Sequence, residues 1–174
     1  IVNLKRHALE LYDTLKQTSN KNCFHISTNM CPNHRKKVLD RVKRLLTGGE
    51  VCHLVATQCV EAGVDIDFPV VFRSWGPLDA LSQAAGRCNR NGRLASGAFK
   101  IFVPEDETYP DPVYKQAAGV TRLSLNKRLT SDLDINDPEI FREYFRELYA
   151  VIDWEKTPLV DAIKLKDFAA TADL

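Results

Sequence analysis

Two arginines three residues apart, Arg87 and Arg90, carry the clearest chemical signal of the sequence, within residues 83–92 (QAAGRCNRNG). Guanidinium groups stay charged and bind phosphate in a bidentate fork. Gly86 leaves little steric bulk beside them, so both can project together from a helix end. Gln83 lies about one helical turn earlier and could position water or phosphate. An arginine from a neighbouring domain accelerates phosphoryl transfer about a thousandfold or more. Taken alone, the pattern also fits a solvated helix edge.

A second segment, residues 54–69 (LVATQCVEAGVDIDFP), offers contacts of a different kind. Thr57 ends a predicted buried strand, so its hydroxyl, with the following Gln58, faces an edge where a nucleic-acid phosphate could be held. Gly63 permits close approach of the backbone, and Asp65 could accept hydrogen bonds from ribose hydroxyls. The alternative is a strand, a short helix and a turn, in which Gly63 serves only the turn and Asp65 caps it.

Further candidates for phosphate contact follow an earlier strand. Ser27 and Thr28 precede a helix that begins near Pro32, and a helix N-terminus binds phosphate; ordinary helix capping is the alternative. Arg35, within the basic run 34–37 (HRKK), could extend this phosphate track, although such a run also fits a solvated helix face.

The elements expected to position these residues alternate between strands and helices. Short β-rich runs occupy residues 23–26, 51–56, 70–72 and 99–103, Ile1–Val2 resembles the end of a strand, and helical periodicity covers residues 4–15 and 32–46. This alternation predicts an α/β fold, a parallel sheet with helices on both faces. Ligands of such sheets bind beyond the carboxyl ends of the strands, where the candidate residues lie.

The character of the sequence changes after Pro104. Residues 105–112 are acidic and contain prolines, and Asp137–Pro138 is a typical start of a helix, whose Phe141 and Phe145 we expect to pack in a core. We therefore predict a main domain over residues 1–112 and a helical extension over residues 113–174.

Charge divides the sequence in a similar way. Residues 1–100 hold 15 Lys and Arg against 8 Asp and Glu, whereas residues 101–174 hold 9 against 15. A basic half that carries the motifs is consistent with a polyanionic partner, although solvated helix faces carry such runs too.

Composition favours a soluble cytoplasmic protein. Hydrophobic residues make up 44% and charged residues 27%, and neither a membrane-length apolar run nor a signal peptide is recognisable. The five cysteines form no CxxC pair, which is typical of reduced thiols. Cys23, His25, Cys31 and His34 lack the spacing of a standard zinc finger, so we favour core and loop roles for them, and whether they bind a metal stays open. The first residue is Ile1, so we expect a fragment of a longer protein.

Together and in this order, the two segments resemble motifs V and VI of superfamily two helicases, T-x5-G-x-D-x3-P followed by Q-x2-G-R-x2-R. The resemblance implies a RecA-like domain that closes on a partner RecA-like domain across ATP. It makes Arg87 and Arg90 arginine fingers and Gln83 the leading residue of motif VI. Gly63, Asp65 and Gly86 would lie at the nucleotide. Thr57 and Gln58, supported by Ser27, Thr28 and Arg35, would hold the nucleic-acid backbone.

A closer similarity is to the CRISPR-associated helicase–nuclease of type I systems and covers most of residues 1–150. It rests on residues 1–3 (IVN), 27–35 (STNMCPNHR), 61–69 (EAGVDIDFP), 83–90 (QAAGRCNR) and 144–149 (YFRELY). Leu4 departs from the pattern, where a small polar residue is expected. The resemblance implies ATP with Mg²⁺ as cofactor, a first RecA-like domain and an HD nuclease domain in the same protein, and single-stranded DNA and the CRISPR surveillance complex as partners.

The sequence contains no GxxxxGK[ST] phosphate loop, no DExD/H segment and no HD pair. We therefore expect the chain alone to bind nucleotide weakly, to hydrolyse nothing and to supply no metal ligand. Two alternatives remain open: a non-catalytic module that binds nucleic acid or protein, and another superfamily two enzyme such as an RNA helicase. Direction of travel, preference for DNA or RNA, and oligomeric state stay open.

Overall fold

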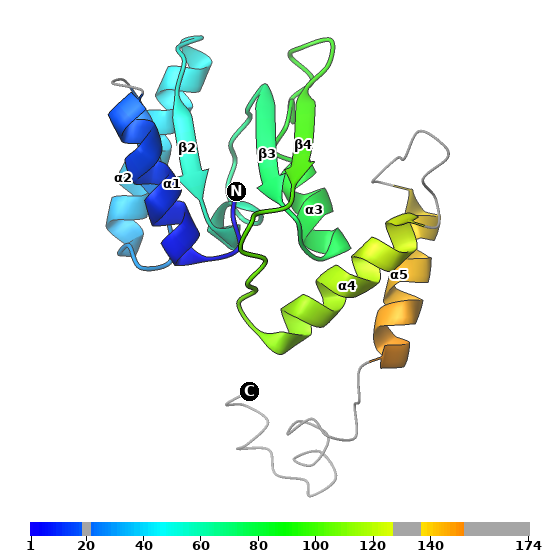
Figure 1. The fold of residues 1–174 in the computed structure, drawn as a ribbon. Coiled ribbons are helices and arrows are strands. Elements are labelled where there is room, and N and C mark those ends of the chain that lie inside the picture. The colour runs from blue at the N-terminus through cyan, green and yellow to red at the C-terminus, as the bar shows by residue number, and fades with distance from the viewer. Residues whose placement is uncertain (19–21, 127–136, 152–174) are drawn as a thin grey trace, which may run out of the picture.

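A computed structural model describes residues 1–18, 22–126 and 137–151 (Figure 1). Its elements run in the order α1 (Lys5–Thr18), β1 (Cys23–Ile26), α2 (Pro32–Thr47), β2 (His53–Ala56), the short 3-10 helix η1 (Gln58–Val60), β3 (Val70–Ser74), α3 (Leu78–Ala85), β4 (Ala98–Phe102), α4 (Pro112–Asn126) and α5 (Pro138–Val151). The predicted α/β alternation is confirmed, and all four strands lie within two residues of their expected ends.

The strands form two parallel pairs rather than one continuous ladder. β1 pairs with β2, and β3 pairs with β4. Ile1 and Val2, predicted as a strand end, join the two pairs: the Val2 amide donates to the Ala56 carbonyl at 2.9 Å, and the Ser74 amide donates to the Ile1 carbonyl at 2.9 Å. Figure 1 shows the N-terminus between β2 and β3. The carboxyl ends of β2 and β3 therefore meet beside residues 1–3.

Helices cover both faces of the β1–β2 pair, as predicted. Val55 on β2 packs with Ala8 and Tyr12 of α1, whereas its neighbour Ala56 packs in a separate cluster with Val38 of α2. Successive side chains of a strand point to opposite faces, so this alternation places α1 and α2 on opposite sides of the sheet.

α2 begins and ends where its local sequence dictates. Pro32 occupies its first turn, where the missing amide proton costs nothing, and Gly48 caps its end, followed by Gly49 at a φ of 71°. No helix in the described part of the chain is long and apolar enough to cross a membrane.

The carboxyl-terminal helices build a third core against α3. Leu78 of α3 packs with Ala117 and Val120 of α4 and with residues of α5, among them Tyr144. α5 begins at Pro138 as expected, and the predicted packing role of its phenylalanine stripe is confirmed. The predicted division at residue 112 coincides with the start of α4, but the division itself stays a prediction. Residues 127–136 and 152–174 of the predicted extension lie outside the described residues.

Candidate nucleotide and nucleic-acid sites

The two motif segments lie side by side because a short β-bridge joins them. The Phe68 amide donates to the Arg87 carbonyl at 2.9 Å, and the Asn89 amide donates to the Phe68 carbonyl at 2.8 Å. The end of the first motif is therefore fixed in register with the end of the second.

The bridge brings Asp65 and Arg90 together at the surface. Arg90 Nε lies 3.8 Å from Asp65 Oδ1, and Lys43 Nζ of α2 lies 4.0 Å from Asp65 Oδ2. The side chains of Asp65 and Arg90 are 73% and 42% exposed. An exposed ion pair contributes at most about 1 kcal/mol, so a ligand can redirect both side chains at low cost.

Asp67 fixes the turn that carries Arg90. One oxygen of its carboxylate accepts from the Arg90 amide at 2.7 Å, and the other accepts from the Asn91 amide at 3.2 Å and the Asn91 side chain at 2.9 Å. The sequence analysis assigned no separate role to Asp67, and a contact with a residue 23 positions later has no local sequence signal.

Arg87 occupies a different environment from Arg90. Its Nε and Nη2 donate to the main-chain oxygen of Glu61 at 3.2 and 2.5 Å, and the residue is only 9% exposed. Its Nη1 is buried without a hydrogen-bond partner among the described residues. α3 ends at Ala85, and Arg87 turns inward beyond it. The two arginines therefore do not project together from one helix end, contrary to the sequence-based expectation.

The remaining candidates of the nucleotide side are exposed. Gln83 lies exposed on α3, and Gly86 caps the end of that helix. Gly63 has a φ of 68°, and no described atom lies within 4 Å of the point where a Cβ would stand. The positive φ of the turn therefore favours glycine at position 63, whereas packing within the chain does not require it. The surface beside Gly63 is open.

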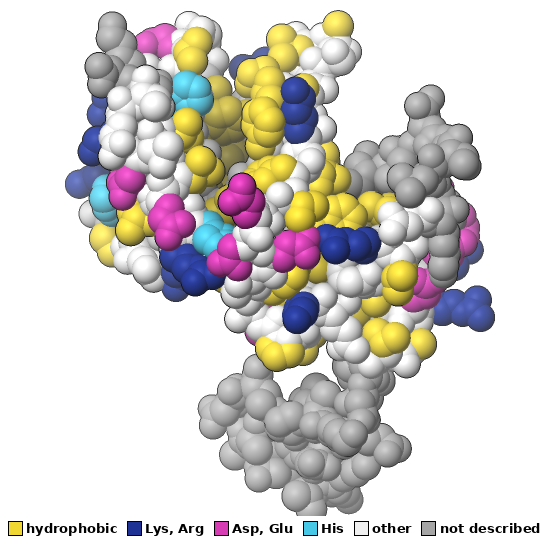
Figure 2. All heavy atoms as spheres, in the orientation of Figure 1, with side chains coloured by type: hydrophobic (Ala, Val, Ile, Leu, Met, Phe, Trp, Pro, Cys, Tyr) yellow, Lys and Arg dark blue, Asp and Glu magenta, His cyan; other side chains and the backbone are white. Residues whose placement is uncertain are grey.

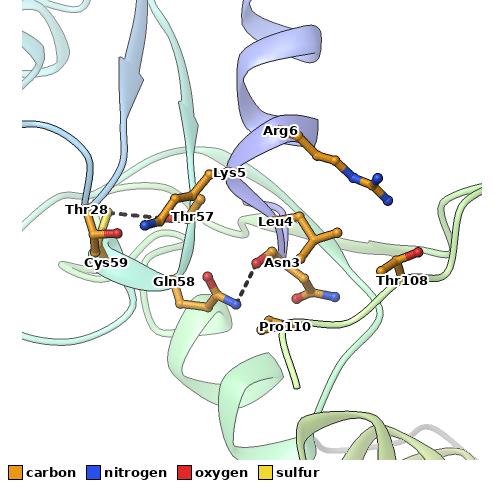
Figure 3. Close-up of a pocket in the computed structure, with 10 residues that line it drawn as sticks. All are labelled: Asn3, Leu4, Lys5, Arg6, Thr28, Thr57, Gln58, Cys59, Thr108 and Pro110. Atoms are coloured by element: carbon orange, nitrogen blue, oxygen red, sulfur yellow. Dashed lines mark hydrogen bonds between the residues drawn. The ribbon is translucent and has the colours of Figure 1, made fainter. Parts of the chain in front are cut away.

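An open cavity of about 550 Å³ lies at the carboxyl ends of β1 and β2 (Figure 3). Thr28, Thr57 and Gln58 line it, as the sequence predicted for residues that follow parallel strands. Thr57 and Ser27 are both buried, and Ser27 does not line the cavity. The Thr57 hydroxyl donates to Cys59 Sγ at 3.5 Å. The residues that line the cavity are Asn3, Leu4, Lys5, Arg6, Thr28, Thr57, Gln58, Cys59, Thr108 and Pro110.

Two basic residues of this cavity come from the start of α1 and were missed by sequence reasoning. Lys5 Nζ donates to Asn29 Oδ1 at 2.9 Å, and Arg6 pairs with Asp106. Arg35, by contrast, lies in the first turn of α2 and does not line the cavity. The N-cap residue of α2, Cys31, forms no side-chain capping bond. The missed signal was an adjacent basic pair at a helix start directly after a predicted strand end.

A buried ion pair separates the two candidate sites. Arg73 Nε on β3 lies 2.7 Å from Glu61 Oε1, and both side chains are almost completely buried. Arg73 also donates to Asn3 Oδ1 at 2.7 Å and to the Tyr114 hydroxyl at 2.8 Å. Burial raises the pKa of the Glu61 carboxyl, and the neighbouring guanidinium opposes that shift. Sequence reasoning missed this network; the available signal was an arginine inside an apolar strand.

The described residues include no cluster of potential metal ligands. Within the described ranges, no three His, Cys, Asp or Glu side chains approach closely enough to hold a metal ion, and the four-residue Cys/His set of the sequence is not gathered into one. Asp65 is already paired with two cations.

The fold is a parallel α/β arrangement with helices on both faces and polar loops at its strand ends, the class to which RecA-like domains belong. The chain belongs to the family of C-terminal regions of the CRISPR-associated nuclease/helicase Cas3, which matches residues 1–93.

Two curated relatives are similar in sequence, and solved structures share the fold. The CRISPR-associated nuclease/helicase Cas3 of Haloferax volcanii is 31% identical over 138 residues, which cover 65% of this chain and 15% of that protein. The Cas3 of Thermus thermophilus is 36% identical over 66 residues, 35% of this chain and 7% of that protein. The crystal structure of T. fusca Cas3 with ATP superposes with a TM-score of 0.66 at 21% identity, over 98% of this chain and 22% of that one. The chain thus spans about a fifth or less of these relatives.

Proposed function

We propose that this chain is the second RecA-like domain of an ATP-driven DNA translocase and completes an ATP site formed with a first RecA-like domain. One observation carries the proposal: the bridge between the motifs places Asp65 and Arg90 together, exposed, beside an open turn at Gly63. Arg90 then neutralises charge on the transferred phosphoryl group. Asp65 and Gly63 contact the nucleotide on the same surface.

Arg87 contributes to the same phosphate once it leaves the Glu61 carbonyl, and Gln83 and Gly86 border the site. The chemistry of the nucleotide's magnesium ion requires ligands from the first domain, since the described residues lack a suitable set. The chain alone is therefore expected to be inactive.

The cavity at the strand ends is proposed to hold the single-stranded DNA backbone. Thr28, Thr57 and Gln58 offer hydroxyl and amide groups, and Lys5 adds a positive charge. These are the groups that bind phosphate without reading sequence. Ser27 and Arg35 flank this track. Figure 2 shows basic side chains near the start of α1, with acidic side chains beside them.

We further propose that the full-length protein carries an HD nuclease domain and acts with a CRISPR surveillance complex in the cytoplasm. The similarity to the Cas3 proteins supports this, as does a structure of a CRISPR RNA-guided surveillance complex in its pre-nicking state, which has a TM-score of 0.63 to this chain at 16% identity. A non-catalytic binding module remains the competing function. The test is DNA-dependent ATP turnover of the full-length protein with Arg87→Ala or Arg90→Ala, against Arg93→Ala, an exposed arginine outside the motif.

A further inference from the structure

The DNA-side cavity is connected to the buried ion pair through Asn3. The main-chain oxygen of Asn3 accepts from Gln58 Nε2 at 2.9 Å, and both residues line the cavity. The side-chain oxygen of Asn3 accepts from Arg73 at 2.7 Å and from the Tyr114 hydroxyl at 2.8 Å. A ligand that moves Asn3 or Gln58 therefore changes the hydrogen bonds of Arg73.

The nucleotide side is connected to the same ion pair through Glu61. The Glu61 carboxylate holds Arg73 at 2.7 Å, and the main-chain oxygen of Glu61 holds Arg87 at 2.5 Å. One residue thus binds the buried arginine with its side chain and the motif arginine with its backbone. A movement of Glu61 therefore alters the anchor of Arg87.

Arg73 is held by an ion pair and by several hydrogen bonds, but its Nε forms no hydrogen bond of good geometry among the described residues. Nε faces Glu61, Nη1 donates to Asn3 and Ser74, and Nη2 donates to Tyr114. Arg73 is fully buried, so the loss or displacement of one partner cannot be compensated by water. Because a buried charge tolerates few partner sets, this network favours discrete arrangements over gradual ones.

The Arg87 guanidinium is bound to Glu61, but not all of its nitrogens have a hydrogen-bond partner in the described part of the chain. Its Nη1 is buried without a partner among the described residues, although its other nitrogens bond Glu61. A buried unpaired donor on a charged group is costly, which lowers the free energy needed to release this side chain toward a phosphate.

We propose that the Arg73–Glu61 ion pair couples DNA binding in the cavity to the placement of Arg87 at the ATP site, with Tyr114 of α4 as a positioning residue. This inference rests on the proposed function. The arrangement with Arg87 on the Glu61 carbonyl is the DNA-free position. DNA that displaces Asn3 and Gln58 shifts Arg73 and Glu61, and Arg87 is released. DNA has this effect only to the extent that it binds the released arrangement more tightly.

The test uses Tyr114→Phe in the full-length protein, because it removes only the hydroxyl that holds Arg73 and Asn3. Tyr109→Phe is the matched control: its ring lies 6.0 Å from that of Tyr114, and it takes no part in the network. The readout is the ratio of ATP turnover at saturating single-stranded DNA to turnover without DNA. We expect Tyr114→Phe to lower this ratio roughly two- to tenfold, with the DNA dissociation constant and the KM for ATP unchanged. Tyr109→Phe should retain the ratio.

A second variant, Glu61→Gln, keeps the shape of the side chain and removes its charge, and it should lower the same ratio. All assays run at a temperature at which thermal melting shows every variant folded. A wild-type ratio in both variants would overturn the coupling. Arg90→Ala measured in parallel separates the two claims: if it abolishes turnover while both variants keep the wild-type ratio, the coupling alone fails. If Arg90→Ala leaves turnover intact, the proposed function fails.

Discussion

Arg87 donates two hydrogen bonds to the main-chain oxygen of Glu61, so motif VI is anchored to motif V inside the protein. Arg90, three residues later, is 42% exposed and faces Asp65 at 3.8 Å. The two arginines of one motif thus have different roles in the folded chain, and their replacement should affect stability differently.

Arg87→Ala should lower the free energy of unfolding by about 2 kcal/mol, because it removes charge-assisted bonds to a buried carbonyl. Arg90→Ala should change it by less than about 1 kcal/mol, because its ion pair is exposed. Urea unfolding of the 174-residue chain measures both. Equal losses would show that the buried contact of Arg87 is not formed.

The Arg73–Glu61 pair should be costly to break from one side only. Arg73→Met should destabilise the chain by about 3–5 kcal/mol, since it leaves the Glu61 charge buried and unpaired. The double variant Arg73→Met/Glu61→Leu should be more stable than Arg73→Met alone, because both charges are then removed. Arg122→Met, which breaks the exposed pair with Glu107, is the control and should cost less than about 1 kcal/mol. If the double variant had a lower free energy of unfolding than Arg73→Met, the buried ion pair would be refuted.

Gly63 and Gly119 provide a matched pair of glycine substitutions. A Cβ would meet no atom within 4 Å at either position, but Gly63 has a φ of 68° and Gly119 lies within α4. Gly63→Ala should destabilise the chain by about 1–2 kcal/mol through backbone strain. Gly119→Ala should stabilise it by about 1 kcal/mol through helix propensity. Denaturant unfolding measures both, and shifts of the same sign would contradict the turn geometry at Gly63.

Lys5 tests the DNA track through the salt dependence of binding. If Lys5 contacts a phosphate in the cavity, Lys5→Ala should reduce the slope of log affinity for single-stranded DNA against log salt by about 0.7. Lys16→Ala, at the far end of the same helix, removes an equal charge outside the cavity and should leave the slope unchanged. Fluorescence anisotropy across a salt series distinguishes the two. Equal slopes for the two variants would place the DNA elsewhere.

Sequence reasoning predicted the elements well because their signals are local. The strands, the start of α5 at Pro138 and the polar residues after β1 and β2 all follow from periodicity, proline position and strand direction. Thr28, Thr57 and Gln58 accordingly lie together in one cavity.

Contacts between distant segments escaped the same reasoning. Arg73 bonds Asn3, which is 70 positions away in the sequence, and Tyr114, which is 41 positions away. No local sequence pattern encodes such pairings. The inward turn of Arg87 also depends on where α3 stops and on a carbonyl 26 residues earlier. The spacing of two arginines therefore predicted their chemistry but not their separate orientations.

DNA-stimulated ATP hydrolysis of the full-length protein with Arg90→Ala, beside Arg93→Ala and with single-stranded DNA binding measured on the same preparations, tests whether Arg90 acts as an arginine finger. Turnover should fall about a thousandfold in Arg90→Ala while DNA binding is kept, and Arg93→Ala should behave as wild type. Wild-type turnover in Arg90→Ala would mean that Arg90 is no arginine finger and would favour a binding module over the second half of a motor.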